Sequence, residues 1–72
     1  MQTIKVATIF DKGKIKPVWF INDGRRYPVR EINYEWVKKN GASKVYHFAV
    51  SDGTNTFELS FDDREMTWKI ED

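Results

Sequence analysis

Histidine is the side chain best suited to proton transfer near neutral pH, and this sequence contains one, His47. His47 stands in an alternating segment, on the face opposite Tyr46 and Phe48. No serine or aspartate is arranged with it as a catalytic triad or a nucleophile elbow would require. We therefore expect a solvent-facing histidine in the middle of a strand, and a chain that is not an enzyme.

Acidic side chains gather at Asp62, Asp63 and Glu65, where a divalent cation could be considered. They lack the spaced oxygen ligands and the central glycine of a calcium loop. The sequence has no cysteine, which excludes disulfides and thiolate metal sites. Its four glycines are isolated, so no glycine-rich loop can bind a phosphate. We expect a charged turn here, and neither a metal nor a cofactor.

Basic and aromatic residues offer a different chemistry, because Lys and Arg neutralise phosphates while aromatic rings stack on bases. We therefore predict nucleic-acid binding through basic turns and exposed aromatic rings. The competing interpretation is that the basic residues protect strand edges from aggregation and the aromatic rings fill the core. The candidate binding residues are Trp19, Arg25, Arg26, Arg30, Tyr34, Trp36, Lys38, Lys39 and Lys44.

The charge is divided unevenly along the chain, although the net charge is only +1. Residues 1–44 carry ten Lys or Arg against four Asp or Glu, and residues 45–72 carry two against seven. A basic half can form a binding face. It can equally attract the acidic half inside a small barrel, and both interpretations remain open.

A simple meander would decide where these charges meet, since alternate turns lie at the same end of the sheet. The acidic turn at Asp62–Glu65 would then lie beside the turns at Gly13 and Gly41. Arg25 and Arg26 would lie at the opposite end. We therefore expect salt bridges within the barrel to compete with any ligand, although exposed pairs contribute only about 0 to 1 kcal/mol each.

A protein-interaction module is the alternative function. In the segment Val18–Ile21 both faces are apolar, and we assign Val18 and Phe20 to the core. Trp19 and Ile21 would then point outward and form an apolar strip or edge of the kind that marks interfaces. This alternative predicts a protein partner or a homodimer.

The elements that must position these residues belong to one small domain, residues 1–72. A chain of this size buries only about 60% of the surface that its unfolded form exposes, so its core needs large side chains. Eleven residues are Phe, Tyr or Trp, and each can remove roughly 150 to 250 Å² from water. Aromatic side chains therefore take the place of disulfides.

Each glycine follows a polar residue at a point where a strand should turn, namely at Gly13, Gly24, Gly41 and Gly53. Asp-Gly and Asn-Gly between apolar segments are strong hairpin signals. The alternation is clearest in 45–51 and 56–62, and the last strand places Met66, Trp68 and Ile70 on one face. We predict a five- or six-stranded antiparallel meander or barrel, SH3-like or related.

The segment from Arg25 to Lys39 is the least regular. A helix is conceivable for 29–39, but Pro28 and the aromatic and β-branched content favour a strand. Tyr27 and Val29 occupy odd positions, whereas Ile32, Tyr34 and Trp36 occupy even ones. Because side chains alternate along a strand, this change of parity predicts a β-bulge or sharp bend near Arg30-Glu31, within one long strand.

Several spaced motifs lie between Pro17 and Ile70. They are Pro17-x-x-Phe20, Gly24-x-x-Tyr27-x-Val29-x-x-Ile32-x-x-x-Trp36, Tyr46-x-Phe48-x-Val50-x-Asp52-Gly53, Phe57-x-Leu59 and Trp68-x-Ile70. In these motifs the chain resembles a small bacterial β domain of unknown function, which occurs alone and at the C-terminus of proteins related to translesion DNA polymerases. The resemblance implies an accessory role near DNA transactions.

No segment contains the long apolar run of a signal peptide or a membrane span. We therefore expect a cytoplasmic protein that does not bind membranes.

Overall fold

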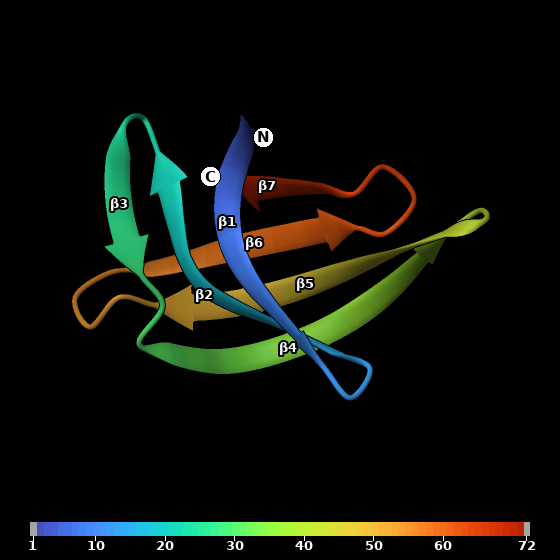
Figure 1. Cartoon of the computed structure of the whole chain (residues 1–72), viewed down its shortest axis with the longest axis horizontal. Coiled ribbons are helices and arrows are strands. Elements are labelled where there is room, and N and C mark those ends of the chain that lie inside the picture. The colour runs from blue at the N-terminus through green and yellow to red at the C-terminus, as the bar shows by residue number, and fades with distance from the viewer. Residues whose placement is uncertain (1, 72) are drawn as a thin grey trace.

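The fold is a single antiparallel sheet of seven strands (Figure 1). The computed structural model describes residues 2–71. Its strands follow the order β3-β2-β1-β7-β6-β5-β4 across the sheet. They are β1 (Gln2–Asp11), β2 (Lys14–Asn22), β3 (Arg25–Pro28), β4 (Glu31–Asn40), β5 (Ser43–Ser51), β6 (Thr56–Asp62) and β7 (Thr67–Glu71).

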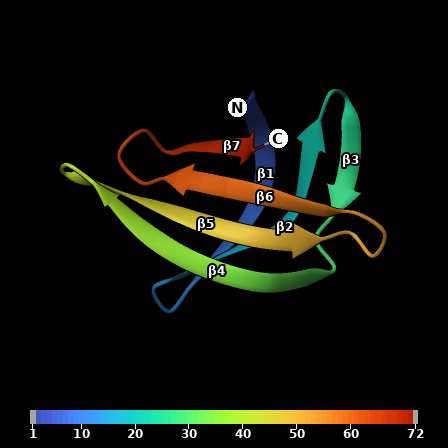
Figure 2. The same ribbon diagram turned by 180° about the vertical axis from the view of Figure 1, so that it is seen from behind.

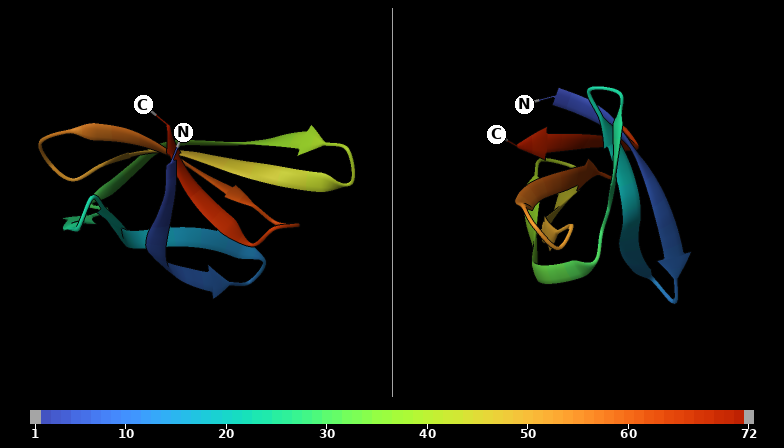
Figure 3. Two further views of the ribbon diagram at one scale, coloured as in Figure 1. Left: turned by 90° about the horizontal axis from the view of Figure 1, so that it is seen from above. Right: turned by 90° about the vertical axis from the view of Figure 1, so that its left-hand side faces the viewer.

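The sheet folds over on itself into a half-barrel. β1 pairs with β7 only over Gln2–Ile4 and then leaves that strand. The remainder of β1 pairs with β2, so that β1, β2 and β3 form a layer that crosses the layer of β4 to β7 (Figures 1 and 2). Seen from above, the two layers stay joined at one end and separate toward the β1–β2 and β4–β5 turns (Figure 3).

The strand count is seven rather than the five or six that we predicted, because the long third segment divides at Val29 and Arg30. The Val29 backbone N–H donates to the Val18 carbonyl at 2.9 Å, and the Arg30 N–H donates to the Ser51 carbonyl at 2.8 Å. Two successive amides thus bind strands of the two different layers, β2 and β5. The predicted bend is confirmed beside the expected position, and strand rather than helix follows it.

The turn glycines occupy the predicted positions, and all four have positive φ. At the two turns in the β1–β2–β3 layer the residue before the glycine, Lys12 or Asp23, also has positive φ. Positive φ at both central residues is the pattern of a type I′ turn, whose twist matches that of the two strands it joins. These turns therefore set the hairpin register.

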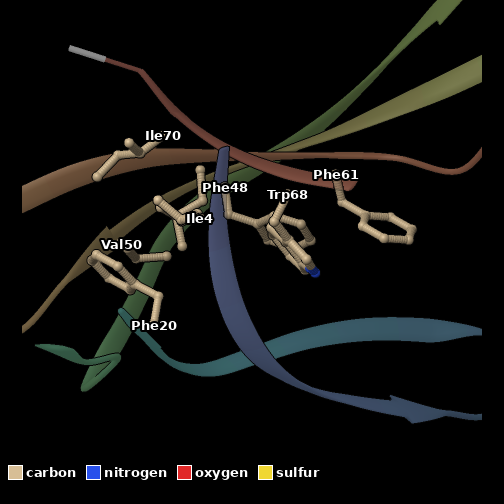
Figure 4. Packing of buried hydrophobic residues seen from close by; sticks show 8 residues of the cluster. Ile4, Phe20, Phe48, Val50, Phe61, Trp68 and Ile70 are labelled. Carbon is tan, nitrogen blue, oxygen red and sulfur yellow. The ribbon is translucent and has the colours of Figure 1, made fainter. Parts of the chain in front are cut away.

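The core lies between the two layers, and Figure 4 shows side chains from both of them converging there. Phe20 is fully buried, with its ring centroid 5.1 Å from that of Tyr27 and 5.2 Å from that of Phe57. The buried apolar residues are Ile4, Phe20, Phe48, Val50, Leu59, Phe61, Trp68 and Ile70. Aromatic rings thus occupy much of the core, as the composition predicts.

Two assignments made from the sequence are wrong, that of Val18 to the core and that of Met66 to the same face as Trp68 and Ile70. The register between β1 and β2 shifts so that Val18 has no partner, and the buried position that we gave to Val18 is taken by Pro17. A bulge inserts one extra residue and so moves the preceding residues to the other face. Met66 lies in the β6–β7 turn with positive φ and is 68% exposed, so it is not a core residue.

We expect Phe20→Ala to lower the free energy of unfolding by about 3 to 5 kcal/mol, because it leaves a cavity among three packed rings. The matched control is Phe10→Ala, which removes a ring that is 60% exposed and should cost less than about 1 kcal/mol. Urea denaturation followed by tryptophan fluorescence measures both. Equal losses in the two variants would contradict the assigned core.

Candidate binding face

The nine candidate binding residues do not form one surface. Four of them, Tyr34, Trp36, Lys38 and Lys39, lie on β4, and Lys44 lies near the start of β5. The others lie on or beside the second layer, at Trp19 on β2, Arg25 and Arg26 on β3, and Arg30 at the bend. The structure therefore separates one aromatic and basic group from another.

The side chains of Tyr34, Trp36 and Lys38 share the outer face of the sheet. The β4–β5 register shifts at Asn33, after which these three residues pair with Ala49, His47 and Val45. Paired residues in a sheet point to the same face, and this face is opposite to that of the core residues Phe48 and Val50. The Tyr34 ring is 66% exposed, and its centroid lies 5.3 Å from that of Trp36.

His47 is buried, so the prediction of a solvent-facing histidine is wrong. Its ring stacks on Trp36 with centroids 5.1 Å apart and planes 7° apart. On its other side β6 supplies Ser60, which is also buried. Alternation placed His47 on the outer face, but it could not reveal that a neighbouring tryptophan covers it. His47 therefore acts as the support of an aromatic platform.

The imidazole of His47 also has an unusual polar environment. Its Nδ1 atom is buried without a hydrogen-bond partner, and the nearest carboxylate oxygen, from Glu58, lies 3.7 Å away. That distance is too long for a hydrogen bond. The ring is held by stacking rather than by a polar network.

A hollow of about 400 Å³ adjoins this platform. Its lining includes the basic residues Lys38, Lys39 and Lys69 and the acidic residues Asp62 and Glu71. Its remaining lining residues are Asn40, Val45, His47, Ser60 and Thr67. The site can therefore present ammonium groups to an anion, and carboxylates to an amino group.

Sequence reasoning missed His47, Ser60 and Lys69 as parts of this face. They lie in one cross-strand row, since Trp36 pairs with His47, His47 with Ser60, and Ser60 with Lys69. The sequence contains the information that predicts this row. Counting paired positions outward from the turns of the β4–β5 and β6–β7 hairpins places these residues opposite one another.

The second group surrounds Trp19. The guanidinium carbon of Arg26 lies 4.0 Å from the centre of the indole ring, which is a cation–π contact. Trp19 and Ile21 both point outward and are half-buried. Because Arg26 covers part of Trp19, the predicted apolar strip is smaller than the sequence indicates.

Arg30 lies against the β5–β6 loop and contributes to its structure. A Cβ atom at Gly53 would lie 3.1 Å from the Arg30 Cδ atom, so this glycine gives the side chain room. The Asp52 carboxylate accepts backbone N–H groups from Thr54 at 2.8 Å and Asn55 at 2.7 Å. These hydrogen bonds lower the pKa of Asp52, with a smaller contribution from the Arg30 charge.

Lys44 lies beside the acidic turn, as the meander predicts. Its backbone N–H donates to the Asp63 carboxylate at 2.8 Å, and the Asp63 N–H donates to the Lys44 carbonyl at 3.1 Å. Across residues 2–71, however, no Lys or Arg side chain forms an ion pair with a carboxylate within 4.0 Å, and the one close basic–acidic contact is that of His47 with Glu58. The predicted salt bridges between basic and acidic turns therefore do not form in this part of the chain.

Within residues 2–71, no three His, Cys, Asp or Glu residues lie close enough together to hold a metal ion. The same part of the chain has no helix of the length and apolar character needed to cross a membrane. Comparisons with protein-family models, with curated proteins and with solved structures found no match to this chain.

We expect His47→Phe to change the free energy of unfolding by less than about 1 kcal/mol, because it keeps the stack on Trp36 and removes an unpaired buried nitrogen. His47→Ala should cost about 1 to 3 kcal/mol, since it removes the stacked ring. Thermal and urea denaturation compare the two variants. A large loss in His47→Phe would show that the imidazole nitrogens, rather than its stacking, stabilise the fold.

We expect Asp52 to make the fold less stable in acid. A carboxyl with a lowered folded-state pKa stabilises the protein at pH values above its ordinary pKa of 3.8. That contribution disappears as the pH falls below 3.8 through the folded-state pKa. Asp52→Asn should therefore show a smaller loss of stability than the parent between pH 4 and pH 2, measured by urea denaturation. The control is Asp11→Asn, because the Asp11 side chain is exposed and lies at the end of β1, beside a different turn.

Proposed function

We propose that this chain is a non-enzymatic binding module that holds single-stranded nucleic acid on the outer face of β4 to β7. The observation that supports it best is the row of rings on that face. Tyr34 is exposed, Trp36 lies beside it, and the ring of His47 on the neighbouring strand stacks on Trp36. Aromatic side chains held rigidly on a sheet provide stacking surfaces for unpaired bases.

The hollow beside the rings supplies the polar contacts that such a ligand needs. The side chains of Lys38 and Lys69 lie on the outer face with the rings, where their ammonium groups can neutralise phosphates next to a base stacked on Tyr34. Asp62 and Glu71 can accept hydrogen bonds from the amino groups of bases. Their negative charge also keeps the electrostatic attraction modest, so stacking supplies most of the affinity.

The fold and its context belong to the same proposal. A strongly bent strand that serves both layers is a feature of SH3-like barrels, and we propose that this half-barrel is related to them. Small barrels of this kind often bind nucleic acids. The resemblance to the bacterial β domain would place the module near DNA transactions, and the same role would suit a cytoplasmic protein.

We expect Tyr34→Ala to weaken binding of a fluorescent oligothymidylate of about ten nucleotides by roughly 5- to 150-fold, since each stacked base contributes about 1 to 3 kcal/mol. The exposed position of Tyr34 should leave the fold intact. Trp19→Ala is the matched control, because Trp19 lies on β2 beneath Arg26. Fluorescence anisotropy measures both. Equal weakening, or no binding by the parent chain, would contradict the proposed face.

The same titration at several salt concentrations tests the basic residues. Loss of one phosphate contact in Lys38→Ala should reduce the slope of log affinity against log salt by roughly 0.7. Lys12→Ala, at the β1–β2 turn, should leave the slope unchanged. A slope that falls only in Lys12→Ala would show that the phosphate contacts lie at the basic turns rather than on the outer face of β4.

A further inference from the structure

β4 is an edge strand of ten residues, Glu31–Asn40, and its only partner in the sheet is β5. Its other edge carries backbone N–H and C=O groups that no second strand pairs. Long, exposed strand edges of this kind are ready to pair with another chain. The other edge strand, β3, has only four residues and offers much less. β4 is therefore the principal unpaired edge among residues 2–71.

Space exists beside this edge. No Cα atom of β2 comes within 8 Å of a Cα atom of β4, whereas paired strands lie about 4.8 Å apart. Two adjoining hollows, of about 160 and 380 Å³, lie between the β1–β2 hairpin and β4, and both are lined by Lys14, Ile15 and Glu35. β4 therefore has no paired strand on that side, and the hollows leave part of its inner face open.

The charges on β4 select its partner. From the bulge at Asn33 onward, the inward-facing side chains of β4 are Glu35, Val37 and Lys39, which pair with β5 on the core side. This short series carries an acid, an apolar residue and a base in symmetric positions. If two copies pair antiparallel about Val37, Glu35 of each copy faces Lys39 of the other.

We propose that two copies of this chain form a symmetric dimer by antiparallel pairing of their β4 strands, with the two-fold axis at Val37. Side chains that face each other across the dyad must point to the same side of the joined sheet. The two-fold axis must therefore pass through a residue of β4. If it passed through Glu35 or Lys38, the two copies of that charged residue would face each other. The register at Val37 instead gives two Glu35–Lys39 pairs, an isologous contact.

Apolar groups favour the same arrangement. Val37 is 53% exposed, and Phe10 at the end of β1 is 60% exposed. In the dimer the two Val37 side chains would meet at the dyad, where their exposed apolar surface is removed from water. An exposed apolar group at an unpaired edge gains most from such a contact.

The dimer extends the proposed function without depending on it. Pairing about Val37 places Trp36 of one copy opposite Lys38 of the other on the outer face, so that the two platforms become continuous. The oligomeric state can be measured without any nucleic acid. A monomer that still binds oligonucleotide would overturn the dimer alone, and a dimer that binds none would overturn the proposed function alone.

Sedimentation equilibrium on the full chain provides the test, with 8.6 kDa expected for the monomer and twice that mass for the dimer. Glu35→Lys and Lys39→Glu should each weaken dimerisation roughly tenfold or more, because each change creates two like-charge contacts across the dyad. The double variant Glu35→Lys/Lys39→Glu should restore dimerisation, since it only exchanges the partners. Both positions are exposed, so folding should be preserved.

Matched charge reversals in the β6–β7 turn, Glu65→Lys and Arg64→Glu, should leave the dimer unchanged. Amide hydrogen exchange gives a second readout, in which residues 34–40 become more protected as concentration rises and β3 does not. A parent chain that stays monomeric at millimolar concentration would overturn the proposal. So would a double variant as weak as the single ones, or concentration-dependent protection confined to β3.

Discussion

The two hydrogen bonds at the bend determine how the rest of the chain can be arranged. Val29 binds the carbonyl of Val18 on β2, and the next residue, Arg30, binds the carbonyl of Ser51 on β5. Because the two N–H groups of adjacent residues point to opposite sides of an extended chain, one dipeptide can join two layers. Closure at this point holds the layers together at one end, opposite to the end where β1 and β2 diverge from β4.

A half-barrel closed only at one end has consequences for its surfaces. The layers separate toward the β1–β2 and β4–β5 turns, so β4 keeps a free edge and Phe10 and Val37 keep apolar surface in contact with water. The outer face of β4 and β5, in contrast, is covered in part by the Trp36–His47 stack, which joins the two strands. One edge of the molecule thus combines an unpaired backbone with an ordered aromatic face.

Much of this fold could be predicted from the sequence, and the reasons for the failures are specific. Strict alternation in β5, β6 and the last part of β7 identified buried Phe48, Leu59 and Trp68, because a strand with one buried face must alternate. Val18 was misassigned because both faces of Val18–Ile21 are apolar, so no change of parity marks the bulge there. The change of parity near Arg30 did reveal the bend, since two clear patterns lay on either side of it.

The candidate site was harder to predict than the fold, because its contacts depend on pairs of strands. Tyr34, Trp36 and Lys38 were identified by residue type, but their grouping apart from Trp19 and Arg26 depends on which layer each strand joins. His47 was misplaced for a related reason. Burial on an outer face arises when a large neighbour on the next strand covers the ring, and a single strand's pattern contains no information about that neighbour.

Lys38 and Lys39 reconcile the free edge with specificity. Lysines on edge strands discourage indiscriminate pairing, because a random partner strand leaves their charges unmatched. Together with Glu35, Lys39 favours pairing only with a strand that places an acidic residue opposite Lys39 and a basic residue opposite Glu35. An antiparallel copy of β4 meets that condition by symmetry, whereas an arbitrary extended segment does so only by its own sequence. The same side chains that protect the edge therefore favour one partner over others.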